Sequence, residues 1–78
     1  MSGQVKSRVV NLVDHNLSNK ELHVLQLIAD KRTVDEISDE IDMSSFTVQA
    51  LLSSIVTKLD ANSVSHAVAV AIRKNYIR

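Results

Sequence analysis

The sequence predicts an all-α domain, and three of its properties support that class. Hydrophobic residues make up 45% of its 78 residues, which is too large a share for a disordered chain. One Gly and no Pro are present, so the residues that form the many turns of all-β proteins are missing. Apolar residues recur at helical spacing, most clearly in Val48, Leu52, Ile55 and Leu59. A chain of this length is expected to form one small domain.

Residues 1–16 are predicted to be a separate N-terminal segment. Val5, Val9 and Leu12 are spaced as on one face of a helix, which predicts a possible extra short helix over residues 4–13. Such a helix would either pack on its own domain or act as a dimerisation arm, and packing is the simpler interpretation. Residues 17–78 are then the main domain.

The first helix of the main domain is predicted from its cap. Ser18 and Glu21 have the spacing of a capping box, in which each side chain bonds the backbone N–H of the other residue. Lys31 and Arg32 suit the end of this helix, because cations oppose the helix dipole there. The residues expected on its buried face are Leu22, Leu25, Ile28 and Ala29.

A second capping box, Thr33 with Glu36, predicts a short helix that follows at once. Met43 would close the turn after it, and Ser44 would cap a longer helix over residues 45–59. A short helix, a tight turn and a longer helix form a helix-turn-helix. The Val48 side of the longer helix should be buried, and its opposite side is uncharged. The residues expected on that exposed side are Phe46, Ala50, Ser53, Ser54 and Thr57.

A last helix is predicted over residues 64–74, with Asn62 or Ser63 as its cap and Asn75 in a left-handed conformation at its end. Its expected inward residues are Val64, Ala67, Val68, Ala71 and Ile72. Val70 is then left outside this face, beside His66 and Lys74. An extra apolar residue on the exposed side of a terminal helix is typical of a contact with a second copy. The predicted dimerisation residues are Val64, His66, Val70 and Lys74.

Composition excludes several classes of function. Without Cys, the chain has no disulfide and no thiolate metal site, and no His has a second ligand at the spacing of a metal site. One Phe and one Tyr are too few for a protein that stacks single-stranded bases. No group of residues resembles a catalytic site or a small-molecule or cofactor site, so an enzyme is not expected. No apolar run reaches the roughly 20 residues of a membrane helix, and no signal-peptide core follows the first charges, so a cytoplasmic protein is expected.

The charge distribution is unfavourable for binding DNA. The net charge is zero, no Lys or Arg lies between residues 33 and 57, and five acids lie in eight consecutive residues. Affinity for a duplex comes largely from Lys and Arg at phosphates, so the basic footprint is weak. The five acids are Asp35, Glu36, Asp39, Glu40 and Asp42.

From residue 17 to residue 77 the chain resembles the LuxR/NarL-type (GerE-like) helix-turn-helix domain of bacterial transcription regulators. The matching pieces are Leu17-Ser18 with Glu21, the run of residues 24–29, Glu36-Ile37, Ser44 with Thr47-Val48, Ile55 with Lys58-Leu59, and Ala67-Val68 with Ala71 and Ile77. The resemblance implies a four-helix fold whose third helix enters the major groove, with Thr47 and Lys58 at phosphates and the last helix in a dimer. It also suggests a stand-alone member of the family, from a bacterium or a phage.

The chain departs from the family mainly where charges are expected. Asp35 replaces a usual basic residue at the start of the second helix, Lys31 replaces a usual Gly, and Val64 replaces a usual Arg. In the third helix, positions that are commonly basic or His in the family are Gln49, Leu51, Ser54 and Thr57. The residues that support the fold are kept while several that would contact DNA are not.

Two hypotheses of different classes follow. The first is a small DNA-binding transcription regulator, in which Phe46 and Ala50 contact thymine methyl groups and Gln49 pairs with adenine. It would bind double-stranded DNA as a homodimer or as a heterodimer with another regulator. Its predicted DNA-binding residues are Thr33, Ser45, Phe46, Thr47, Gln49, Ala50, Ser53, Ser54, Thr57 and Lys58. The alternative is a protein-interaction module, such as an antagonist of a regulator, on the same scaffold.

Overall fold

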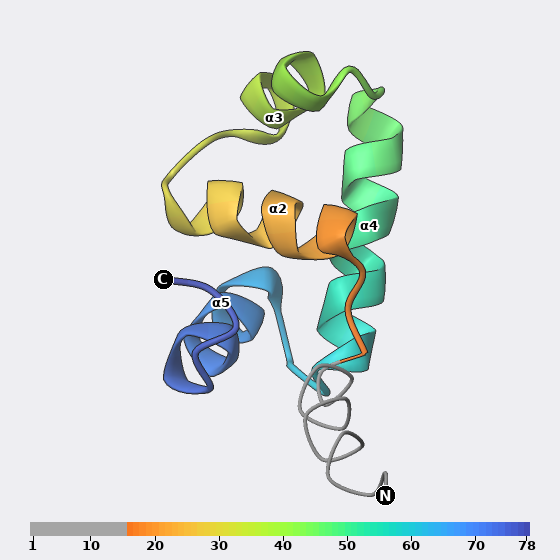
Figure 1. Ribbon diagram of the computed structural model, residues 1–78. Helices are drawn as coiled ribbons and strands as arrows, with labels where there is room; N and C mark the ends of the chain where they lie inside the picture. The colour runs from red at the N-terminus through yellow and green to blue at the C-terminus, as the bar shows by residue number, and fades with distance from the viewer. Residues whose placement is uncertain (1–15) are drawn as a thin grey trace, which may run out of the picture.

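The computed structural model describes residues 16–78, which form four helices and no strand, as the all-α prediction requires. The helices are α2 (Asn19–Ala29), α3 (Val34–Ile41), α4 (Ser45–Lys58) and α5 (Val64–Arg73). The predicted helix over residues 4–13 lies outside the described residues. Figure 1 shows α4 running the length of the domain, with α3 at one end, α5 near the other and α2 crossing between them. Within the described part of the chain, no helix is long and apolar enough to cross a membrane.

Each of the four helices in residues 16–78 begins at the residue that the sequence predicts. The side-chain oxygens of Ser18, Thr33, Ser44 and Ser63 each accept a hydrogen bond from the backbone N–H three residues later. In α2 and α3 the capping box is complete, because a Glu carboxylate also accepts the N–H of the cap residue, at 2.9 and 2.8 Å. These local bonds satisfy N–H groups that the helix itself leaves free.

The core forms where α4 meets the other three helices. The predicted apolar stripe of α4 is buried at Val48, Leu52 and Ile55. Leu59, its fourth predicted member, is only half-buried, because it lies just past the end of the helix.

Helix α2 differs in part from the prediction. Leu25 is buried as predicted, but Val24 and Leu27 are buried as well, and the other three residues expected to face inward are only half-buried. The reason is that α2 contacts α3, α4 and α5, so it buries a wider arc than one stripe. The half-buried residues are Leu22, Ile28 and Ala29.

Helix α5 is rotated relative to the prediction. Val70, which was predicted to lie outside the inward face, is only 9% exposed, whereas Ile72, which was predicted to face inward, is 44% exposed. The face that covers the core consists of Ala67, Val70 and Ala71, at helical spacing. Ile72 follows Ala71 by one residue and therefore points well away from that face.

Each helix ends with a residue other than Gly in a left-handed conformation. These residues are Lys31, Asp42, Asp60 and Asn75, with φ between 55° and 71°. After α2 the N–H of Arg32 donates to the carbonyl of Leu27 at 3.0 Å, the bond that typically accompanies such an end. The predicted conformation of Asn75 is confirmed.

Replacing Lys31 with Gly should raise the free energy of unfolding by about 0.5–1 kcal/mol. The left-handed conformation costs a side chain with a Cβ about 1–2 kcal/mol, of which the flexibility of Gly in the unfolded chain cancels a part. Urea denaturation measures the change. Asn75→Gly is the matched control and should gain less, because Asn tolerates this conformation. A destabilised Lys31→Gly variant would contradict the prediction.

Candidate nucleic-acid interface

The exposed side of α4 is the candidate interface, and four of the five residues predicted to lie there are exposed. The turn between α3 and α4 is closed by the Ser38 hydroxyl, which donates to the Met43 carbonyl. The Val48 side of α4 packs in the core, and the opposite side faces solvent. Phe46 is 81% exposed and is the most exposed large apolar residue of the described chain. The exposed residues of this helix include Phe46, Thr47, Gln49, Ala50, Ser53 and Thr57.

An open groove runs beside this exposed side, between α4 and the start of α5. Its volume is about 420 Å³, and its lining combines apolar and hydroxyl-bearing side chains. Val64, one of the predicted dimerisation residues, also lines this groove. The lining residues are Gln49, Leu52, Ser53, Val56, Thr57, Ser63 and Val64.

Two predicted DNA-binding residues are bound to α2 instead of projecting freely. Lys58 Nζ donates to Glu21 Oε1 and Ser54 Oγ donates to Glu21 Oε2, each at 2.9 Å. Ser54 is half-buried, so the prediction that it lies on the exposed side is wrong. The Lys58 side chain is 34% exposed. The only charge on α4 is therefore paired within the domain.

Glu21 is the centre of this arrangement, and it is only 4% exposed. Burial raises the pKa of its carboxyl, but the Ser18 N–H, the Lys58 ammonium and the Ser54 hydroxyl all stabilise the charged form. These hydrogen bonds and the positive charge of Lys58 outweigh burial, so the pKa of Glu21 lies below its ordinary value of 4.5. Glu21 is thus ionised at neutral pH and joins the start of α2 to the second half of α4.

The predicted hydroxyl contacts near the helix starts are used locally. Thr47 Oγ1 lies 3.0 Å from Ser44 Oγ, within the cap of α4. Thr33 caps α3, and its Oγ1 accepts the N–H of Glu36 at 3.1 Å. Ser45 is half-buried in the first turn of α4. Thr33 and Thr47 remain exposed, so an additional contact with a phosphate is compatible with their caps.

The surface of α3 next to this interface is acidic. Arg32 pairs with Glu40 at 2.5 Å and lies 4.0 Å from Glu36, which offsets part of the charge. The remaining acids of this run are exposed and have no ion pair within residues 16–78. They would repel a phosphate backbone that approached α3. These acids are Asp35, Asp39 and Asp42.

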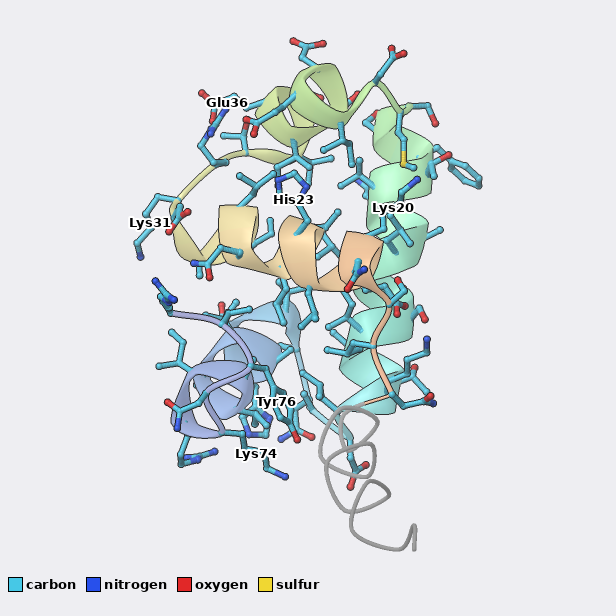
Figure 2. The ribbon with its side chains drawn as sticks, in the orientation of Figure 1. Lys20, His23, Lys31, Glu36, Lys74 and Tyr76 are labelled. Atoms are coloured by element: carbon cyan, nitrogen blue, oxygen red, sulfur yellow. The ribbon has the colours of Figure 1, made fainter. Side chains whose placement is uncertain are left out.

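One exposed cation was not among the predicted DNA-binding residues. Lys20 is exposed in the first turn of α2, next to Glu21, and Figure 2 shows it where α2 crosses α4. Lys31 lies at the far end of the same helix. In the sequence, Lys20 is distinguished only by its position next to Glu21. The contact of Glu21 with α4, which makes that position relevant, cannot be predicted from the sequence.

The four predicted dimerisation residues do not form one exposed face. Val64 lines the groove, Val70 is buried, and His66 Nδ1 accepts the Asn62 N–H at 3.0 Å. Of the four, Lys74 alone is exposed. The large apolar residue of α5 that is exposed is instead Ile72.

Comparisons with known proteins find relatives of this chain. The family described as "Bacterial regulatory proteins, luxR family" (GerE) matches residues 15–71. The chain is 38% identical over 60 residues to the "Uncharacterized response regulatory protein YgeK" of Escherichia coli K12, covering 77% of this chain and 41% of that protein. It is 32% identical over 82 residues to the "Transcriptional regulatory protein LiaR" of Bacillus subtilis, covering 99% of this chain and 39% of that protein.

A solved structure shares the fold. The "Structure of Transcription factor, GerE" superposes with a TM-score of 0.77 at 24% identity, over 80% of this chain and 92% of that one. The chain spans about two fifths of the length of YgeK and LiaR. Together with the helix-turn-helix formed by α3 and α4, the family match shows that this chain belongs to the LuxR family of bacterial regulatory proteins, as a helix-turn-helix domain of DNA-binding transcription regulators.

Proposed function

We propose that this domain binds double-stranded DNA by placing α4 in the major groove. The observation that carries the proposal is the uncharged, solvent-exposed side of α4, which the core and the Glu21 contacts hold in a fixed orientation. In a helix-turn-helix, the N-terminal residues of the second helix contact base edges. Phe46, Gln49 and Ala50 occupy those positions here.

Phosphate contacts would come from the surroundings of α4. Lys20 lies exposed at the start of α2, and Thr47 and Lys58 occupy the positions that the family resemblance assigns to phosphates. Because Lys58 already binds Glu21, its contribution to a phosphate contact would be reduced. The exposed acids of α3 oppose binding further, so one copy of the domain would have low affinity.

Duplex affinity should fall with salt with a slope that corresponds to about two to four phosphates. Replacing Lys20 with Ala should reduce the magnitude of that slope by about one, because one phosphate contact is lost. Fluorescence anisotropy with a labelled random duplex at several salt concentrations measures both values. Lys31→Ala, at the other end of α2, is the matched control and should leave the slope unchanged. Absence of binding even at low salt would reject the proposed function.

Dimerisation is a second part of the proposal, because two copies on adjacent half-sites would offset the weak affinity of one. We assign the contact to the face of α5 that carries Ser65, Ala69 and Ile72, because all three are exposed. A second copy is the occupant that we propose for this face. Because Val70 is buried, replacing it with Asp would disrupt the fold, so Val70→Asp cannot test dimerisation.

Replacing Ile72 with Asp should convert a dimer to a monomer and weaken duplex binding at least tenfold. A charge at the centre of an apolar contact would have to be buried without a partner. Sedimentation equilibrium measures the mass. His23→Asp, at an exposed position of α2, is the control and should leave the mass unchanged. A dimeric Ile72→Asp variant would remove this face of α5 from the proposal.

The alternative function, a protein-interaction module or antagonist on the same scaffold, is supported by two observations. Phe46 is 81% exposed, and three acids beside the helix-turn-helix lack ion pairs within residues 16–78. Lack of duplex binding together with a stable complex with another regulator would favour it.

A cytoplasmic location is part of the proposal. YgeK and LiaR are longer than the matched region, so the activities of whole regulators do not transfer to this chain. A protein with the proposed function acts where the chromosome lies, in the bacterial cytoplasm.

A further inference from the structure

We infer that α4 selects A·T-rich sites, with Phe46 and Ala50 in contact with the 5-methyl groups of thymines. The inference rests on the proposed function and adds a class of target sequence to it. It follows from the exposed side chains of α4 that are not bound to other residues of the domain.

The first step concerns charge. Lys58 is the only basic residue of α4, and its ammonium is bound to the buried Glu21 carboxylate at 2.9 Å. No Lys or Arg lies between residues 33 and 57, so none is present at the start of this helix. The commonest specific contact with guanine is a bidentate bond from Arg or Lys to its O6 and N7 atoms. Helix α4 has no side chain available for that contact.

The second step concerns the apolar residues that remain. Phe46 lies in the first turn of α4, is 81% exposed, and precedes Ala50 by one helical turn. Residues four apart lie on the same side of a helix, so the ring and the exposed methyl group of Ala50 form one short apolar strip. In the major groove, the thymine methyl is the apolar feature that such residues contact.

The third step concerns the polar group beside this strip. Gln49 is exposed, and its amide makes no hydrogen bond within residues 16–78. A Gln amide can pair with adenine through N6 and N7. Ser53 and Thr57, one and two turns further along, carry small neutral hydroxyl groups that impose no preference for guanine. The available side chains thus match adenine and thymine.

The test begins with selection of duplexes from a random library by the full chain. Enriched sites should be rich in A·T pairs. Deoxyuridine then replaces thymine in one enriched duplex, which removes the 5-methyl group and keeps the hydrogen-bonding groups. Affinity for the uracil duplex should be about fourfold lower for each contacted methyl, from the value of one buried methylene converted to a binding ratio.

Variants assign the effect to Phe46. Phe46→Ala should lower the thymine-to-uracil affinity ratio by about fourfold, to the part that Ala50 contributes, while leaving the salt slope unchanged. Gln49→Ala is the matched control, since it should lower affinity for the selected site but keep the ratio. Because Phe46 is so exposed, its replacement should not affect folding, and circular dichroism of the variant checks this.

The outcomes separate this inference from the proposed function. Salt-dependent duplex binding with equal affinity for thymine and uracil duplexes overturns the inference and leaves the proposed function standing. Enrichment of guanine-rich sites does the same. Absence of duplex binding at low salt overturns both. A ratio that is unchanged in Phe46→Ala overturns the assignment of the methyl contact to this residue.

Discussion

Replacing Glu21 with Ala should lower the free energy of unfolding by about 3 kcal/mol. The change removes half of the capping box of α2, which costs about 1 kcal/mol, and hydrogen bonds between a charged carboxylate and two side chains of α4, which cost about 1.5–3 kcal/mol. Lys58 would lose its ion-pair partner but could extend into solvent, which limits the loss.

Urea denaturation monitored by circular dichroism measures this loss. Glu36→Ala is the matched control, because Glu36 completes the capping box of α3 but is exposed and binds no residue of α4. It should cost about 1 kcal/mol or less. Equal losses in the two variants would show that the contacts of Glu21 with α4 contribute nothing to stability.

The pH dependence of stability should reveal the same group. The pKa of Glu21 is lower in the folded protein than its ordinary 4.5, so the folded state favours the ionised carboxylate. This contribution is fully present above the unfolded pKa and is lost as the pH falls below about 4.5 and through the folded pKa. In Glu21→Gln the fall in stability over that range should be smaller than in the wild type. An unchanged pH profile would contradict an ionised, stabilising Glu21.

Replacing Ile55 with Ala should lower the free energy of unfolding by about 3 kcal/mol, within the range of about 2–5 kcal/mol for large-to-small changes in cores. Ile55 is fully buried in the middle of the stripe by which α4 contacts the core. For so small a domain, the melting temperature should fall by at least about 10 °C. Differential scanning calorimetry measures the shift.

Ser53→Ala provides the control for Ile55, since Ser53 lies on the exposed side of the same helix. It should change stability by no more than about 0.5 kcal/mol. A similar loss in both variants would mean that α4 buries both sides, and the candidate interface would then be unavailable to DNA.

Local interactions explain why the helix boundaries could be predicted from the sequence. A cap such as Ser18 or Ser63 bonds a backbone N–H only three residues away, so sequence spacing is sufficient to identify it. The rotation of α5 could not be predicted in this way. Val70 and Ile72 are both apolar, and packing against the rest of the core decides which one is buried.

The candidate interface was predictable in part for the same reason. The exposure of Phe46 and Ala50 follows from the apolar stripe on the other side of α4. The engagement of Lys58 does not, because Glu21 lies 37 residues away in the sequence and meets Lys58 only after α2 and α4 have packed. The surroundings of residues that make long-range contacts therefore could not be predicted from the sequence alone.

The conformation of Asp42 has a consequence for how this surface can evolve. Its φ of 58° is one that Asn and Gly adopt readily, so either residue can replace the acid without changing the path of the chain between α3 and α4. Such a replacement removes a negative charge next to the proposed groove-binding helix. Electrostatic repulsion of DNA and the geometry of the turn are thus separable properties at one position, and selection can adjust the first while keeping the second.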